Sequence, residues 1–104
     1  MGEFVAVGNE GEVGEGEILP FDARGVRVAI ANVDGTLYAF DDTCTHRGCS
    51  LSEGDLEETT IVCACHGGSF DVSTGDPLTP PTTEPIQVYP VRERDGMLEV
   101  DISE

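Results

Sequence analysis

The stretch "VRVAIANVDGTLYAF", residues 26–40, decides the fold expected of this chain. Its halves, 26–33 and 36–40, are rich in β-branched and aromatic residues, which favour β-strands. Asp34-Gly35 lies between them, and this dipeptide is typical of a tight hairpin because both central residues of a type I′ turn need a positive φ. The stretch therefore predicts two antiparallel strands joined by a two-residue turn.

The same pattern recurs towards the C-terminus, where residues 86–94 and 97–102 flank Asp95-Gly96. Helical periodicity is almost absent, and short β-branched or aromatic runs separated by turn residues recur instead. Pro20 favours a sheet edge for its strand, because proline cannot donate a hydrogen bond to a neighbouring strand. Further strands are expected at 4–7, 17–21, 59–63 and 68–71. These patterns predict an all-β protein.

The middle of the chain differs from its ends, because residues 41 to about 81 are loop-rich whereas the flanks are plain hairpins. We expect one domain over 1–104, with a sheet base formed by 1–40 and 82–104. The subdomain at 41–81 is then an insertion that carries the functional site. Residues 75–85 contain four prolines and are expected to form a stiff connection back to the base.

The charge balance is strongly acidic, with 21 Asp and Glu against five basic residues and a formal net charge of -16. Nucleic acid and anionic membranes are therefore poor partners, and a basic protein surface is the natural one. The alternative is that the acidic residues only keep the protein soluble, as in a salty cytoplasm. We expect a cytoplasmic protein, because the sequence has no apolar run of about 20 residues and no basic N-terminal region.

All four cysteines and both histidines fall into two short stretches, "CTHRGC" and "CACHGG". The two pairs with metal-ligand spacing are Cys44 with His46 and Cys63 with His66. Sixteen residues separate His46 from Cys63, so two loops could hold one ion or cluster. Two thiolates and two imidazoles suit either zinc or a two-iron cluster with cysteines on one iron and histidines on the other.

"CTHRGCSLSEG" followed by "CACHGGSFDVSTGDPL" resembles the Rieske-type ferredoxin family, and the resemblance extends over essentially the whole chain. It implies an antiparallel β-sandwich or barrel base with a loop-rich cluster-binding subdomain. It also implies a [2Fe-2S] cluster, with Cys44 and Cys63 on one iron and His46 and His66 on the other.

The resemblance assigns roles to other residues near the motif. In the family branch of cytochrome bc-type complexes, cysteines at the offsets of Cys49 and Cys65 form a disulfide, so the same bridge is expected here; two buried free thiols are the alternative. Gly68 and Phe70 stand where high-potential members have serine and tyrosine donors, which predicts a potential in the lower half of the roughly -150 to +300 mV range. The residues expected around the cluster are Arg47, Gly67, Gly68, Phe70 and Pro80.

The resemblance implies an electron carrier and not an enzyme. A monomeric soluble ferredoxin would pass single electrons from a flavin-containing, NAD(P)H-dependent reductase to a terminal oxygenase. The first alternative is a small Rieske subunit of a larger reductase, similar to that of nitrite reductase. The second, from another functional class, is a zinc-stabilised binding module.

Overall fold

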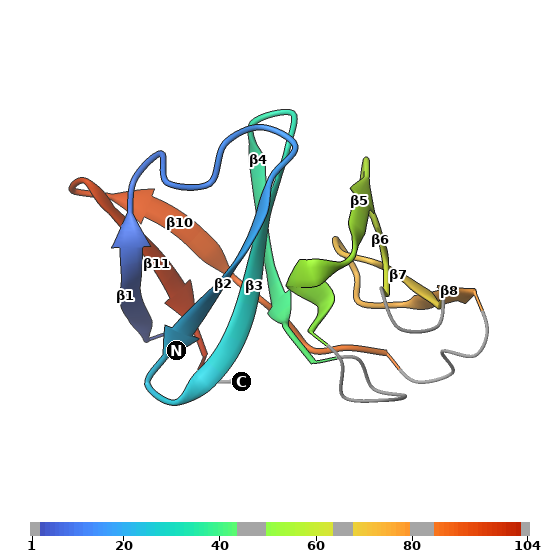
Figure 1. Ribbon diagram of the computed structural model, residues 1–104. Helices are drawn as coiled ribbons and strands as arrows, with labels where there is room; N and C mark the ends of the chain where they lie inside the picture. The colour runs from blue at the N-terminus through green and yellow to red at the C-terminus, as the bar shows by residue number, and fades with distance from the viewer. Residues whose placement is uncertain (1–2, 44–49, 64–67, 80–84, 103–104) are drawn as a thin grey trace.

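The computed structural model describes residues 3–43, 50–63, 68–79 and 85–102. These residues form eleven strands and one 3-10 helix, and every strand pair among them is antiparallel (Figure 1). The all-β fold is therefore confirmed. Within the described residues, no helix is long and apolar enough to cross a membrane.

The described strands form three sheets. The first has the order β1 (Phe4–Asn9), β11 (Met97–Asp101), β10 (Val91–Arg94). The second, here called the central sheet, has the order β2 (Ile18–Ala23), β3 (Val26–Val33), β4 (Thr36–Asp41), β9 (Val88–Tyr89). The third, the site sheet, has the order β5 (Asp55–Glu57), β6 (Thr60–Val62), β7 (Ser69–Asp71), β8 (Pro77–Thr79). The 3-10 helix η1 (Leu51–Glu53) precedes β5.

Both predicted Asp-Gly hairpins are present. In the β3–β4 hairpin, Asp34 has a φ of 53° and Gly35 a φ of 90°, as a type I′ turn requires. The turn between β10 and β11 repeats this geometry at Asp95 and Gly96. Pro20 lies in β2, the edge strand of the central sheet, which also agrees with the sequence.

The predicted strand at 86–94 is wrong, because the chain divides there between two sheets. Its first part is β9 of the central sheet, and its second part is β10 of the first sheet. Pro90 separates them, and its carbonyl accepts a hydrogen bond from the Asp101 N–H at 2.9 Å. The sequence also did not predict β5, which lies in the middle expected to be loop-rich, or β8, which lies in the expected connection at 75–85.

The central sheet is buried on both faces and lies between the other two sheets (Figure 1). On β3, Ala29 and Ala31 pack against residues of the site sheet, whereas Ile30 packs against residues of the first sheet. On β4, Phe40 and Ala39 divide in the same way. This alternation follows from the two-residue period of a strand. The first sheet and the site sheet are therefore joined through the two faces of one sheet.

Gly75 holds the described residues on either side of segment 80–84 together. Its φ is 87°, and its carbonyl accepts a hydrogen bond from the Ile86 N–H at 2.9 Å. A Cβ built at Gly75 would collide with the Ile86 carbonyl oxygen, whereas one built at Gly35, with a φ of 90°, meets nothing within 4 Å. The two glycines thus share a conformation and differ in the space around them.

We predict that Gly75→Ala destabilises the protein more than Gly35→Ala. Alanine at Gly35 bears only the cost of the left-handed conformation, about 1–2 kcal/mol. Alanine at Gly75 adds a steric clash with backbone, for a further ~1–3 kcal/mol. Urea unfolding followed by far-UV circular dichroism measures both variants, and equal losses would show that the close approach at Gly75 is unimportant.

Candidate metal centre

Three segments carry most of the predicted site residues: 44–49, 64–67 and 80–84. Outside the described residues lie Cys44, His46, Arg47, Cys49, Cys65, His66, Gly67 and Pro80. The structure describes the other three predicted residues, Cys63, Gly68 and Phe70, together with the residues that flank each segment.

The flanks of segment 64–67 are joined by a short hydrogen bond. Cys63 directly follows β6 and Gly68 directly precedes β7, and the Cys63 N–H donates to the Gly68 carbonyl oxygen at 2.7 Å. The neighbouring strands continue this pairing, with Val62 opposite Ser69. The backbone around Cys63 is therefore fixed by the sheet.

Cys63 is 2% exposed and belongs to the core between the central sheet and the site sheet. Phe70, which is fully buried, lies in the same core. A buried thiol fits both a metal ligand and a packing residue. Phe70 brings no hydroxyl to this position, and Gly68 brings no side chain, so neither offers a side-chain donor to a group held nearby.

The flanks of segment 44–49 are also paired. Thr43 and Ser50 form an isolated antiparallel bridge across the segment. Next to this bridge, the Leu51 N–H donates to the Asp42 carbonyl oxygen at 2.5 Å. The end of β4 and the start of η1 therefore lie side by side.

The side chain of Asp42 reinforces this pairing. Its carboxylate is 1% exposed and accepts hydrogen bonds from Arg27 Nε at 2.7 Å, Ser50 Oγ at 2.6 Å and the Ser52 N–H at 2.8 Å. Burial would by itself raise the pKa of Asp42, but the hydrogen bonds from Ser50, Ser52 and Arg27 outweigh it and hold this pKa below its ordinary value. Sequence reasoning did not identify Asp42 as an anchor, although it stands between a strand and the first ligand motif.

A third set of contacts links the flanks of segments 80–84 and 44–49. Beyond the Gly75–Ile86 hydrogen bond, Tyr89 Oη on β9 donates to Asp41 Oδ1 at the end of β4, at 2.7 Å. Burial, the hydrogen bond to Asp41 and the charge of Asp41 all raise the pKa of Tyr89. Strand β9 therefore follows segment 80–84 and fixes the end of β4, which leads into segment 44–49.

The flanks of all three segments meet in one core. Leu51 lies just after segment 44–49, Cys63 just before 64–67, and Ile86 just after 80–84, and all three are 4% exposed or less. They belong to the same cluster of buried residues. One buried apolar cluster therefore contains a flanking residue of each segment.

The described residues alone do not complete a metal site. Across 3–43, 50–63, 68–79 and 85–102, no three His, Cys, Asp or Glu residues are placed to hold a metal ion. The ligand set of Cys44, His46, Cys63 and His66 remains a prediction, because the structure describes only one member. A buried cysteine on a fixed flank is nevertheless what the predicted donor set requires at this position.

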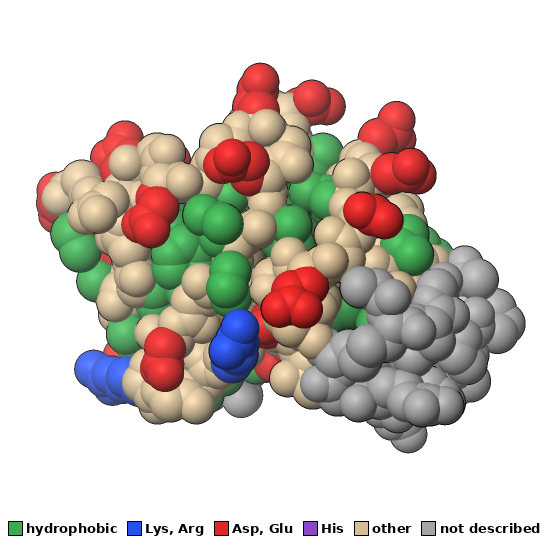
Figure 2. Space-filling model, viewed as in Figure 1, with side chains coloured by type: hydrophobic (Ala, Val, Ile, Leu, Met, Phe, Trp, Pro, Cys, Tyr) green, Lys and Arg blue, Asp and Glu red, His purple; other side chains and the backbone are tan. Residues whose placement is uncertain are grey.

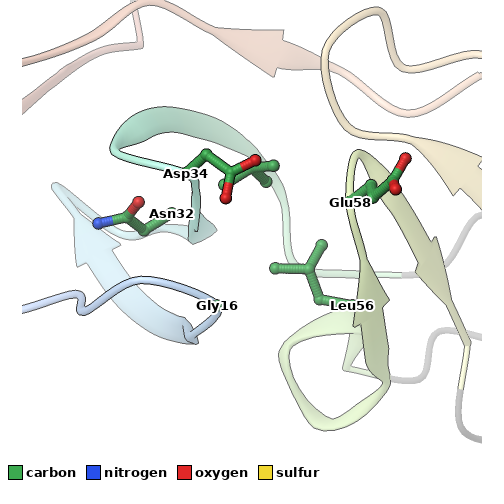
Figure 3. A pocket seen from close by; sticks show the side chains of 6 residues that line it. Gly16, Asn32, Asp34, Leu56 and Glu58 are labelled. Atoms are coloured by element: carbon green, nitrogen blue, oxygen red, sulfur yellow. The ribbon is translucent and has the colours of Figure 1, made fainter.

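A separate cleft of about 130 Å³ lies between the β3–β4 hairpin and the β5–β6 hairpin. Asn32 and Asp34 line it from the β3–β4 hairpin, and Leu56 and Glu58 line it from the β5–β6 hairpin. The Leu56 side chain points into the space between the hairpins, whereas the Glu58 carboxylate points away from it (Figure 3). Cys63, the predicted ligand that the structure describes, does not line this cleft. It marks where the tips of the central sheet and the site sheet approach each other.

A model of the Rieske [2Fe-2S] domain family matches residues 3–90. The ferredoxin component of a naphthalene 1,2-dioxygenase system from Pseudomonas aeruginosa is 39% identical over 92 residues, 88% of each chain. The ferredoxin subunit of the 3-phenylpropionate/cinnamic acid dioxygenase of Escherichia coli strain K12 is 42% identical over 94 residues, 89% of this chain and 88% of the relative.

Solved structures agree with these matches. The ferredoxin of Sphingomonas yanoikuyae B1 superimposes with a TM-score of 0.89 at 34% identity, covering 95% of this chain and 98% of the other. A chain in the complex of reduced oxygenase and oxidised ferredoxin of carbazole 1,9a-dioxygenase gives a TM-score of 0.87 at 36% identity, covering 94% and 92%.

The raised pKa of Tyr89 predicts a specific alkaline behaviour for Tyr89→Phe. Below pH ~10, where an unfolded tyrosine stays protonated, the wild type should be more stable by about 1 kcal/mol from the hydrogen bond to Asp41. Above that pH the unfolded state releases the phenol proton first, so the wild type loses this advantage as pH rises.

Urea unfolding of the wild type and Tyr89→Phe between pH 8 and 11.5, followed by far-UV circular dichroism, tests this. The difference in stability should narrow above pH ~10. A difference that stays constant through the alkaline range would show that Tyr89 titrates alike in both states.

Proposed function

Because the chain belongs to the Rieske [2Fe-2S] domain family, we propose that it is a one-electron carrier between a flavin-containing, NAD(P)H-dependent reductase and a terminal oxygenase. The observation that carries this proposal is near full-length similarity to ferredoxin components of dioxygenase systems, at 39% and 42% identity. The resident cofactor is a [2Fe-2S] cluster, which supplies a centre that accepts and releases one electron. The chain itself would not be an enzyme.

We assign the cluster ligands to Cys44, His46, Cys63 and His66. The buried position of Cys63 supports this assignment, as does the hydrogen bond that fixes its backbone to Gly68. The role of the protein is to hold both ligand segments on paired flanks, so that the ligands keep one geometry in both redox states. With no side-chain donor at Gly68 or Phe70, we place the reduction potential in the lower half of the Rieske range.

The remaining cysteines, Cys49 and Cys65, are proposed to form a disulfide like that of the bc-complex branch. A bridge here closes a loop of about fifteen residues and would contribute ~3 kcal/mol in the chain-entropy model. It would also tie the two ligand segments to each other. The surroundings of the cluster would then include Arg47, Gly67, Gly68, Phe70 and Pro80.

Variants of single cysteines distinguish the proposed cluster ligands from the proposed disulfide. Cys63→Ser should abolish the cluster, whereas Cys65→Ser should keep close to two irons and two acid-labile sulfides per chain while lowering the thermal midpoint. Iron and sulfide analysis, with mass spectrometry of the denatured, alkylated wild type, gives both readouts. One zinc per chain would overturn the cofactor assignment, and alkylation of Cys49 and Cys65 without reductant would overturn the bridge.

The partners proposed for this carrier present basic surfaces. In Figure 2 acidic side chains gather along the upper edge, over the tips of the β3–β4 and β5–β6 hairpins. Exposed acidic residues at these tips are Asp34, Glu57 and Glu58. With a net charge of -16, the protein would attract a basic partner over long range and repel another copy of itself, which favours a monomer. NAD(P)H as the electron source places the carrier in the cytoplasm.

We also propose a single domain over 1–104, with the base at 1–40 and 82–104 and the cluster-binding subdomain at about 41–81. The three-sheet arrangement supports this division. The site sheet packs on one face of the central sheet, and the first sheet packs on the other.

Leu78 is a candidate contact for the redox partner. Among the described residues, Leu78 and Met97 are the large apolar side chains left exposed, at 52% and 37%. Leu78 lies on β8, the edge strand of the site sheet beside the flank of segment 80–84, whereas Met97 lies on β11 of the first sheet. An exposed apolar residue beside a redox site suits a partner interface.

We predict that Leu78→Asp slows electron transfer from a flavin-containing NADH reductase of a dioxygenase system at least about fivefold. Met97→Asp adds the same charge at the other sheet and should change the rate less than about twofold. Stopped-flow absorbance at fixed ionic strength measures both, with unchanged visible spectra as the check on cluster content. Equal effects of the two variants would remove Leu78 from the interface.

A further inference from the structure

The pair of Arg27 and Asp42 joins the central sheet to the flank of the first ligand segment. Arg27 lies on β3, and its Nε donates to Asp42 Oδ2 at 2.7 Å. The two residues also meet through the backbone, where the Asp42 N–H donates to the Arg27 carbonyl oxygen at 3.3 Å. The contact continues the β3–β4 hairpin, because the register that pairs Val28 with Asp41 puts Arg27 opposite Asp42.

The two partners are exposed to very different degrees. The side chain of Asp42 is 1% exposed, whereas that of Arg27 is 61% exposed. Only the carboxylate is removed from water, and the hydrogen bonds from Arg27, Ser50 and the Ser52 N–H offset the free-energy cost of that burial. A buried charge is uncommon in proteins, so its place at this flank calls for an explanation.

The location of Asp42 supplies that explanation. Its carboxylate holds Ser50 and the Ser52 N–H, which lie beyond segment 44–49, while its own backbone lies before that segment. It stands two positions before Cys44 in the sequence. A buried charge is little screened by solvent, so it would act strongly on a redox centre held by the adjoining ligand segment.

We propose that Asp42 and Arg27 are positioning residues for the first ligand segment and that their opposite charges adjust the reduction potential in opposite directions. The proposal rests on the proposed function, because it concerns the cluster that Cys44 and His46 would hold. The negative charge of Asp42 disfavours the added electron and so lowers the reduction potential. The positive charge of Arg27 partly offsets this effect. Both together fix the flank through hydrogen bonds.

The test compares the reduction potentials of Asp42→Asn and Arg27→Gln by protein-film voltammetry at neutral pH. Asp42→Asn should raise the equilibrium constant for reduction at least about threefold, and Arg27→Gln should lower it at least about 1.5-fold; a tenfold change equals ~59 mV for one electron. Both variants should lower the thermal midpoint of cluster loss, because both weaken the same anchor. A purely structural role would not move the two potentials in opposite directions.

Arg24→Gln is the matched control. Arg24 is 62% exposed, as exposed as Arg27, but it pairs with the exposed Glu3 at 3.3 Å. Its removal changes the net charge equally and should shift the potential less than Arg27→Gln does. In 1 M salt, where the Debye length is about 3 Å, the Asp42→Asn shift should persist because that carboxylate is buried.

The outcomes separate this proposal from the function on which it rests. Potential shifts of the same sign for Asp42→Asn and Arg27→Gln, no shift for either, or equal effects of Arg24→Gln and Arg27→Gln would overturn the electrostatic role while leaving the carrier function intact. If Asp42→Asn does not assemble a cluster, Arg27→Lys decides: it should restore more than half of the shift caused by Arg27→Gln, and no restoration overturns the proposal. A wild type without a redox-active cluster would instead overturn the proposed function.

Discussion

The burial of the central sheet on both faces is the constraint on which the rest of the structure depends. Alternate residues of β3 and β4 point into two separate cores, so neither strand has a solvent-facing side along its middle. Small residues such as Ala29, Ala31 and Ala39 occupy many of these places and allow the neighbouring sheets to pack closely. The base and the site sheet are thereby held by the same two strands.

This arrangement explains how the described residues hold the flanks of segments 44–49, 64–67 and 80–84 together. Each of the three segments is flanked by residues that pair through the backbone, and Leu51, Cys63 and Ile86 anchor those flanks in one core. The flanks thus share one packed base, which is the usual way in which a small scaffold positions a cofactor. Asp42 and Tyr89 add polar contacts at the end of β4, just before segment 44–49.

Much of this architecture could be predicted from the sequence, where local chemistry determines it. The Asp-Gly turns fixed both hairpins, because few other dipeptides adopt two positive φ values, and Pro20 marked an edge strand. The paired Cys and His motifs indicated the cofactor and the family. Of the four predicted ligands, Cys63 lies among the described residues, and Cys44, His46 and His66 lie outside them.

The rest could not be predicted because tertiary contacts determine it. Strand β5 has only three residues, two of them acidic, and exists through its pairing with β6. Strand β8 has only three residues, lies in the proline-rich segment expected to be a stiff connection, and exists through its pairing with β7. The two sides of Pro90 both have strand propensity, so nothing local shows that they join different sheets. The Asp34-Gly35 hairpin register puts Arg27 opposite Asp42, but no local signal shows that this carboxylate is buried and also holds Ser50 and Ser52.

The central claim is that this protein stores and transfers one electron per chain. An anaerobic reductive titration of the purified protein, followed by visible absorbance, tests it most directly. We predict a coloured oxidised protein that takes up one electron per chain in a single step and returns to its starting spectrum on reoxidation. A colourless protein that takes up no electrons, or one that takes up two per chain, would contradict the account.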